Sequence, residues 1–462
     1  MQVESIQLKH TLHFSDIKLE FHYHKLPVTL ILGDQGSGKT ALLRHLYQAL
    51  TWFAARYRDL RTAGVVMLDQ DIMQHRLQSK IDIKVRFPEE IGSFPESSDQ
   101  QTVSTQTCSW QLYKTLNNQG VGLSKAETTQ LEAMVSLYQK ALAKDPMLGL
   151  PLIAYYPAER FVNEINLLSK NNPAIFQTSH AYEVAAIPFT TFTRFFEWFR
   201  EISDIENAQS AQILEQILNH ASQQEKKHNL DELAKHIEHA QIQVNTPSLN
   251  SLREALAIVL PEVTNLYLQY QPKIQLMVTY QGRTQTLQQL PNSIRNWIAL
   301  VGDIVRRLCL LNPKSLFPCK EGNGILMIDG IDHQLDQDMS AVILSRLNQA
   351  FPGLQIVATG NRPELLEQTA EFQCLQLEDQ QLYAIQPDNI QHQFEQLYAE
   401  LGLDATEEEL EAEEHSLTEP EIEQATPESL LQLIQQQLDE SQQQELLRLL
   451  SHKDGQISQP PF

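Results

Sequence analysis

Two spacings of hydrophobic residues alternate along the chain, and together they predict an α/β fold. Alternating apolar and polar residues at 3–8 and 17–23 are typical of half-buried strands. The continuous apolar run VTLIL at 28–32 is typical of a strand buried on both faces. The same signals predict further strands, at 81–87, 110–116, 152–157, 265–270, 273–280, 325–329 and 355–359.

Apolar residues three and four positions apart predict the helices. The segment after Lys39 places four leucines on one helical face. The Phe/Trp-rich stretch at 189–207 also gathers four of its phenylalanines on one face, which predicts an aromatic side packed in a core. Further helices are expected at about 124–145, 206–242, 251–260, 293–311 and 339–350.

A glycine-rich turn, ILGDQGSGKT at 31–40, separates the buried strand at 28–32 from the helix that follows. Its pattern is that of a P-loop, and the strand before it and the helix after it are the required context. In such a loop, backbone N–H groups converge on phosphate oxygens at a helix N-terminus. The lysine reaches the terminal phosphates, and the threonine hydroxyl binds Mg²⁺. We therefore predict an ATP site with Mg²⁺, made of Gly33, Asp34, Gln35, Gly36, Ser37, Gly38, Lys39, Thr40 and Ala41.

The second half of such a site follows a later buried strand. The run ILMIDGID at 325–332 places Asp329 directly after four apolar residues, in the manner of a Walker B strand. A carboxylate at this strand end is a suitable ligand for the Mg²⁺ shell. Thr40 and Asp329 are therefore the expected metal-site residues.

Composition narrows the class of protein. The chain has 462 residues and a formal charge of −23. This charge argues against a chain-wide basic surface for nucleic acid, but it leaves a local basic groove open. No run approaches the roughly 20 apolar residues of a membrane span, so we expect a cytoplasmic protein without membrane contact. The four cysteines are scattered, which favours free thiols over disulfides or a zinc site.

Changes in pattern predict five segments. From Glu400 onward, 16 acidic residues stand against 2 basic ones, so this part is expected to be a solvated, partly disordered tail. Leucines at 430–450 predict a helix there, which either packs on its own domain or docks a partner. The segments are an N-terminal ATPase lobe at 1–70, an insertion at 71–150, an aromatic and helical region at 151–250, a C-terminal ATPase lobe at 251–387 and the acidic tail at 388–462.

The order of these motifs resembles the ABC-type ATPase head of the SMC/RecF/OLD group. More narrowly, it resembles the bacterial AAA-type family of predicted ATP-binding proteins involved in virulence, which includes ATPases of retron-linked and Septu-like phage-defence systems. The resemblance covers about 1–385 and implies a P-loop head, a homodimer closed around ATP, and a separate effector protein. It rests on AYYPAER at 154–160, FFEWFREISDIEN at 195–207, RNWIALVGDIVRRL at 295–308 and FPGLQIVATGNRP at 351–363.

Three positions depart from the pattern of that family. Its signature reads like Leu-Ser-x-Gly, whereas here Leu290 is followed by Pro291 and Asn292, with Ser293 at the glycine position. The glutamate that orients water after the Walker B aspartate is replaced by Gly330, and the switch histidine is missing from the sequence TGNRP at 359–363. Asp332 is the remaining candidate for a catalytic base.

The sequence leaves two possible roles open for each of three arginines. By the resemblance, Arg160 lies near the nucleotide or the dimer face, and a salt-bridged arginine is an equally good expectation. Arg306 and Arg307 either contact DNA phosphates or form surface ion pairs.

Three functional hypotheses follow. The first is a dimeric nucleotide switch with slow or partner-completed hydrolysis. The second is an inactive scaffold that binds a partner through 388–462. The third is a competent ATPase that recruits Asp332 or a residue of a partner. Each leaves the effector unnamed and leaves DNA open as a ligand.

Overall fold

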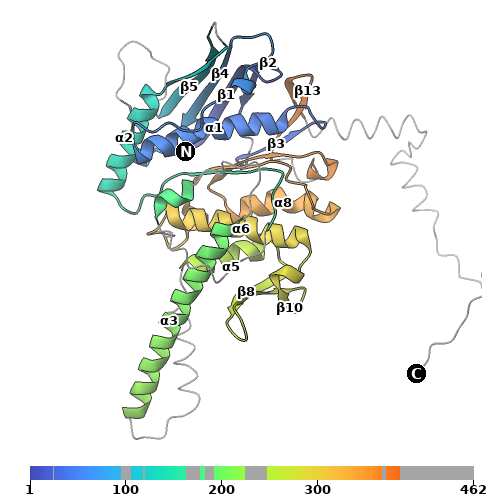
Figure 1. Cartoon of the computed structure of the whole chain (residues 1–462). Helices are drawn as coiled ribbons and strands as arrows, with labels where there is room; N and C mark the ends of the chain where they lie inside the picture. Colours follow the sequence, from blue (N-terminus) through green and yellow to red (C-terminus); the bar gives the residue numbers. More distant parts are fainter. Residues whose placement is uncertain are drawn as a thin grey trace, which may run out of the picture. The chain divides into compact units, whose positions relative to one another are not determined.

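The computed structural model describes residues 1–23, 25–94, 106–117, 120–162, 177–182, 192–223, 247–366 and 371–385. The predicted acidic tail at 388–462 lies outside these residues, as does the part of the helix expected at 206–242 that follows residue 223. Within the described residues, a five-stranded and a six-stranded sheet enclose one helix, and further helices cover the other face of the six-stranded sheet (Figure 1).

The central sheet has six strands and is built largely from continuous apolar runs. It consists of β3 (Val28–Leu32), β7 (Leu152–Tyr156), β11 (Gly324–Ile328), β12 (Leu354–Thr359), β13 (Gln373–Glu378) and β14 (Gln381–Ala384). The strand order is β14-β13-β3-β12-β11-β7, and every neighbouring pair is parallel except the last hairpin, β13–β14. All residues of β3, β11 and β12 are buried, because both faces of the sheet are covered. The carboxyl ends of these three strands therefore meet at one edge.

The second sheet has five strands. It consists of β1 (Gln2–Thr11), β2 (Phe14–Glu20), β4 (Gln78–Arg86), β5 (Thr107–Leu116) and β6 (Gly122–Glu127). The order is β2-β1-β4-β5-β6, and all pairs are antiparallel. Segment 71–150, which the sequence suggests is an insertion, thus supplies three of the five strands and is continuous with the N-terminal lobe. The helix expected at about 124–145 starts later, because its first residues form β6.

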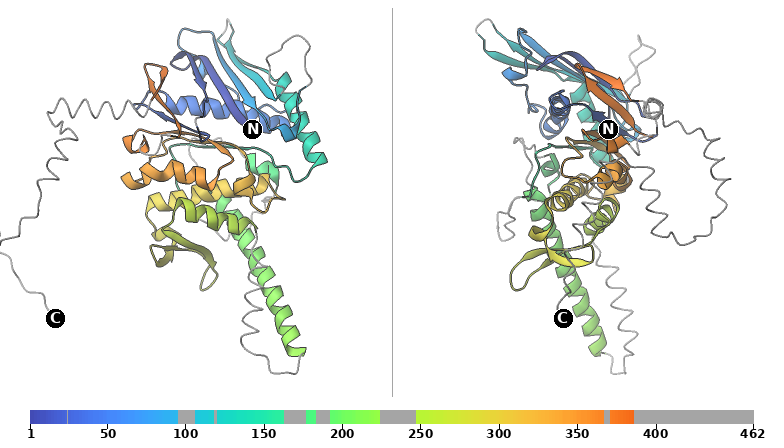
Figure 2. Two further views of the ribbon diagram at one scale, coloured as in Figure 1. Left: turned by 180° about the vertical axis from the view of Figure 1, so that it is seen from behind. Right: turned by 90° about the vertical axis from the view of Figure 1, so that its right-hand side faces the viewer.

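Helix α1 (Lys39–Arg58) lies between the two sheets (Figures 1 and 2). Its leucines face the core and are fully buried. Helix α2 (Thr129–Lys144) packs on α1 and on strand β5 of the second sheet. On the other side of the central sheet lie α5 (Pro247–Val259), α6 (Asn292–Leu311), the short α7 (Pro318–Glu321) and α8 (Gln337–Ala350).

Helix α3 (Thr193–Gln223) begins in the core and runs away from it (Figures 1 and 2). The aromatic residues of its first two turns are buried against α5 and α6. A Cβ at Gly302 of α6 would lie 2.2 Å from the ring of Phe195, so only glycine permits this close approach. The predicted aromatic core helix is present. A small antiparallel sheet follows, made of β8 (Val263–Gln269), β9 (Gln275–Tyr280) and β10 (Arg283–Thr286).

Two further properties of the described residues concern membrane insertion and the reactivity of the cysteines. No helix within the described ranges combines the length and the apolar character of a membrane span. The four cysteines are free, and burial raises the pKa of the Cys108 and Cys309 thiols to about 12. These two thiols are therefore poor nucleophiles near neutral pH.

Candidate functional site

The glycines of the P-loop allow the chain to turn from β3 into α1 at close quarters. Gly38 is the residue before α1 and has φ +106°, a conformation that favours glycine. A Cβ at this position would lie 2.3 Å from Nε2 of His13. His13 belongs to the turn between β1 and β2, and its Nε2 is 3.2 Å from the carbonyl oxygen of Ser37. The antiparallel sheet therefore supports the loop from outside.

The N-terminus of α1 is arranged for an anion. Gly38 offers no side chain to cap the helix, and the first turn holds no acidic residue, so the N–H groups of this turn face outward uncapped. The Nζ of Lys39 donates hydrogen bonds to the carbonyl oxygens of Gly33 and Asp34, the latter at 2.8 Å. Burial lowers the pKa of Lys39, and the negative charges of Asp329, Asp332 and Asp34 oppose this shift. Lys39 is thus held over the loop as a buried cation.

A cavity of about 550 Å³ opens beside this helix end. Its lining joins the P-loop to the carboxyl ends of β11 and β12 and to residues of the antiparallel sheet. Six of the nine predicted P-loop residues line it, whereas Gly33, Asp34 and Ser37 do not. The lining residues are Leu12, Gln35, Gly36, Gly38, Lys39, Thr40, Ala41, Arg44, Gln70, Asp71, Ala158, Asp329, Gly330, Thr359, Gly360 and Asn361.

Asp329 has one occupied and one unoccupied carboxylate oxygen. Its Oδ1 accepts a hydrogen bond from Oγ1 of Thr359 at 2.6 Å, while Thr359 Oγ1 accepts the N–H of Gly330 at 2.9 Å. Its Oδ2 is buried and has no hydrogen-bond partner among the described residues. An unpartnered buried carboxylate oxygen is costly unless a ligand satisfies it. Together with the hydroxyl of Thr40 in the same cavity, this donor set fits Mg²⁺.

Asp332 is placed differently from Asp329. It is buried, and its Oδ2 accepts the backbone N–H groups of Asn361 and Arg362 at 2.8 and 2.9 Å. It does not line the cavity. The carboxylate therefore organises the turn after β12, and this geometry weighs against the predicted role as a base. Gly330, which does line the cavity, has φ +54° and offers no side chain.

Arg160 joins the ends of two parallel strands. Its Nη1 donates to the carbonyl oxygens of Pro157 and Asp329 at 2.9 and 2.7 Å, and its Nη2 donates to Gly330 at 2.8 Å. The side chain is buried, and burial lowers its pKa to about 10 although Asp329 and Asp332 favour the charged form. Arg160 thus lies close to the predicted metal ligand, as the family resemblance implies, but its guanidinium binds the backbone.

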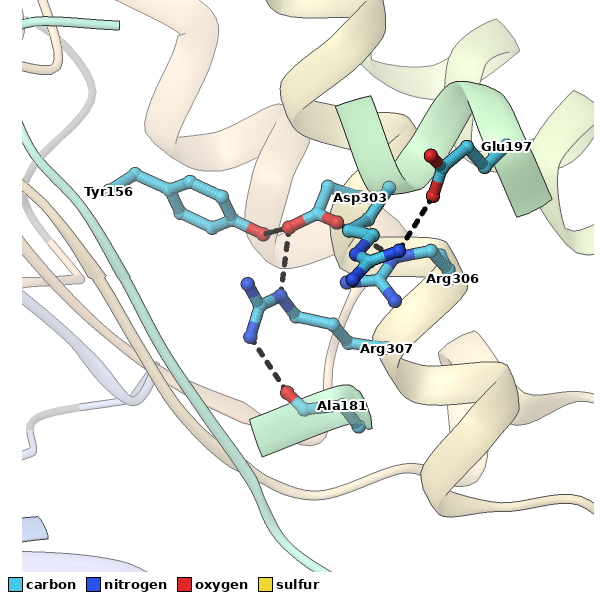
Figure 3. A network of polar contacts seen from close by, with 7 residues as sticks. Tyr156, Ala181, Glu197, Asp303, Arg306 and Arg307 are labelled. Carbon is cyan, nitrogen blue, oxygen red and sulfur yellow. Dashed lines mark hydrogen bonds and ion pairs between the residues drawn. The ribbon is translucent and has the colours of Figure 1, made fainter. Parts of the chain in front are cut away.

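Arg306 and Arg307 form ion pairs, as one of the two interpretations expects, but the pairs lie inside the protein and not on its surface. Their Nε atoms donate to the two oxygens of Asp303 at 2.9 and 2.8 Å, and Tyr156 donates to the same carboxylate at 2.8 Å (Figure 3). Arg306 is only 2% exposed. Burial alone would raise the pKa of Asp303, but the two arginines hold it far below its ordinary value. The cluster is a buried ionic link between α6 and β7 and is unavailable to DNA.

Residues 5–259 match the family described as an AAA domain. The chain belongs to the AAA domain family. The predicted α/β P-loop fold of ABC type is thereby confirmed for the described residues, whose P-loop joins β3 to α1.

Two curated relatives share about a quarter of their aligned residues with this chain. The chain is 25% identical over 401 residues to the Retron Ec83 probable ATPase of Escherichia coli, covering 79% of this chain and 69% of that protein. It is 23% identical over 366 residues to the Retron Vc95 probable ATPase of Vibrio cholerae serotype O1 biovar El Tor, covering 76% and 68%. Similar solved structures include an SMC head bound to the C-winged helix domain of ScpA (11% identity, TM-score 0.45, covering 84% of this chain and 100% of that one) and the recombination mediator RecF (12% identity, TM-score 0.36, covering 83% and 98%).

Several residues of the cavity are absent from the sequence prediction. Thr359, Arg44 and Asp71 all line it, and none belongs to the P-loop or Walker B pattern. Arg44 had a usable signal, because it follows Thr40 by four positions and so lies on the same helical face. Thr359 begins the switch-like segment at 359–363, which the family resemblance places near the nucleotide. Asp71 had no signal, because only the tertiary arrangement brings its turn to the P-loop.

Proposed function

We propose that this member of the AAA domain family binds Mg²⁺·ATP and uses it as a switch, with hydrolysis that is slow or completed by a partner. The observation that carries the proposal is the set of acidic groups around the cavity. Among the described lining residues, the carboxylates are Asp329 and Asp71. Asp329 is suited to the metal, and Asp71 is paired with Arg44.

Nucleotide binding is supported by the P-loop and its surroundings. The N–H groups at the start of α1 and the Nζ of Lys39 would hold phosphate oxygens. Thr40 and Asp329 Oδ2 would hold Mg²⁺, which neutralises charge on the phosphates when bound. The residues present therefore fit the metal–nucleotide complex, and Thr359 fixes the orientation of Asp329 through Oδ1.

Slow hydrolysis is supported by the position after Asp329. A water-orienting group is required there, and Gly330 has none. Asp332 is nearby in sequence but is bound to two backbone N–H groups. The absence of a base or a water-positioning group lowers rates by about 10²–10⁴. A residue of a second subunit or another partner could supply the missing group.

The biological setting is proposed from the relatives. Both curated relatives are probable ATPases of retrons, and the sequence resemblance associates such ATPases with phage defence. We therefore propose a defence role, a homodimer closed around ATP, and a separate effector protein controlled by closure. A second candidate, an inactive scaffold that captures its partner through 388–462, shares the nucleotide site but requires no turnover.

The test compares wild type with Lys39→Ala. Binding of Mg²⁺·ATP and release of phosphate would be measured on the purified full chain, with and without DNA. We expect ATP binding that depends on Lys39 and on Mg²⁺, with little turnover. If wild type binds no nucleotide, the proposal is wrong. Rapid turnover by the chain alone would refute the slow-hydrolysis part and leave binding intact.

A further inference from the structure

The nucleotide cavity has two unlike walls. One wall comes from the central sheet and holds Asp329, Gly330 and Thr359. The other comes from the antiparallel sheet and its connections, and holds Leu12, Gln70 and Asp71. The two sheets that supply these walls lie on either side of α1 (Figure 1). The second wall has no role in the function proposed so far.

Arg44 is the cation of this second wall. It lies four residues after Thr40 on α1, about 6 Å further along the helix axis on the same face. Its Nη2 donates to Oδ1 of Asp71 at 2.7 Å. Asp71 is its one hydrogen-bond partner among the described residues, and the Arg44 side chain remains 44% exposed. The other donors of the guanidinium are therefore free to face the cavity that Arg44 lines.

Asp71 is itself held in place. It is 2% exposed, its Oδ2 accepts the N–H of Leu68 at 2.8 Å, and Nε2 of the fully buried His45 lies 3.7 Å from its Oδ1. Burial would raise the pKa of Asp71, but the contacts with His45, Leu68 and Arg44 lower it overall. The carboxylate is thus a fixed, charged support for the arginine. A guanidinium anchored on one side is well suited to bind phosphate on the other.

We propose that Arg44 binds the α-phosphate of a nucleoside di- or triphosphate, with Asp71 as its positioning residue. The inference rests on the proposed nucleotide site and assigns the orientation of the ligand within it. The β- and γ-phosphates lie toward Lys39 and Asp329, and the nucleoside lies toward Leu12 and Gln70.

The proposed orientation predicts how substitutions of Arg44 change the affinities for ATP and ADP. Because ATP and ADP share the α-phosphate, Arg44→Gln should weaken the binding of both by the same factor, about 10-fold or more. Arg44→Lys, which keeps the charge but loses the planar fork, should weaken both less. In both variants Asp71 keeps the N–H of Leu68 and the neighbouring His45, and thermal unfolding of each variant checks that the fold is retained.

The experiment measures dissociation constants of Mg²⁺·ATP, Mg²⁺·ADP and AMP by calorimetry on the full chain, because AMP carries the α-phosphate without the β-phosphate. The matched control is Arg86→Gln, which removes an exposed arginine that also pairs with a carboxylate, Glu4, at the far end of β1 and β4. It should bind both nucleotides as wild type does. Lys39→Ala reports on the nucleotide site itself.

Each outcome separates the two proposals. Equal losses for ATP and ADP in Arg44→Gln, with none in Arg86→Gln, place Arg44 on a group that the two nucleotides share, and an equal loss for AMP assigns that group to the α-phosphate. Unchanged AMP affinity, with losses for ATP and ADP, overturns the α-phosphate assignment in favour of the β-phosphate. Wild-type affinity in Arg44→Gln, or a loss confined to ATP, overturns it while the nucleotide site stands. Absence of binding in wild type overturns both. Asp71→Asn alone should weaken nucleotide binding, whereas adding it to Arg44→Gln should cause no further loss. If the losses of the two substitutions add in the double variant, the positioning role of Asp71 is excluded.

Discussion

Replacing Asp332 with asparagine separates the two roles considered for this residue. Its Oδ2 accepts two backbone N–H groups, from Asn361 and Arg362, at a site that is 6% exposed. Asparagine keeps an acceptor oxygen but loses the charge, and a hydrogen bond to a charged group contributes roughly 1 kcal/mol more than a neutral one. For two bonds we expect the free energy of unfolding to fall by about 2 kcal/mol. A catalytic base would instead predict a loss of turnover of about 10²–10⁴.

Denaturant unfolding measures the first quantity, and ATP turnover corrected with Lys39→Ala measures the second. Asp336→Asn is a matched control, since Asp336 also accepts a backbone N–H, from Met339 at 2.8 Å, but at the exposed start of α8. We expect Asp332→Asn to lose stability and to keep the turnover of wild type within a few-fold. A collapse of turnover with intact ATP binding and unchanged stability would refute this reasoning and restore Asp332 as the base.

Three further predictions concern the fold and the loop. Asp303→Ala should lower the free energy of unfolding by about 3–5 kcal/mol, because two buried arginines lose their partner, whereas Glu371→Gln at an exposed pair should cost under about 1 kcal/mol; urea denaturation compares them. Because the pKa of Asp303 is depressed, its contribution is complete above its unfolded pKa of about 3.9 and is lost as pH falls through the lower folded pKa, which acid titration of wild type against Asp303→Asn would measure. Gly38→Ala should reduce ATP affinity and cost about 1–3 kcal/mol of stability, because its Cβ would meet His13 at a positive φ; calorimetry and thermal unfolding check both.

Most strands of the central sheet could be predicted from sequence because their residues are almost all apolar. β3, β11 and β12 are continuous apolar runs, which follow from burial on both faces. The polar strands β10, β13 and β14 escaped prediction, because RTQT, QCLQLE and QLYA carry little hydrophobic pattern and depend on their neighbours in the sheet. The helix expected at 251–260 begins earlier, as α5, whose first residue, Pro247, is compatible with a helix start.

The site was predictable as far as local motifs reach. The P-loop carries its own structural context, and Asp329 follows its strand directly, so both could be placed from sequence. Three features could not be placed from sequence, because each depends on segments that are distant in sequence. They are the hydrogen bonds of Asp332 to the backbone after β12, the pairing of Arg44 with Asp71 and the burial of Arg306. Charged residues carry no local signal that distinguishes a buried pair from an exposed one.

The contacts of Arg160 extend beyond the strand ends that it joins. Its own carbonyl oxygen accepts a hydrogen bond from Nδ2 of Asn296 at 3.3 Å, and Oδ1 of Asn296 accepts the N–H of Val162 at 3.0 Å. Asn296 lies near the start of α6, just after the signature-like segment. The backbone of Asp329 and the beginning of α6 are therefore two ends of one short relay of hydrogen bonds. A displacement of the Asp329 backbone would lengthen the hydrogen bonds of this relay, so the relay offers a route by which the two regions would respond to one another within a single subunit.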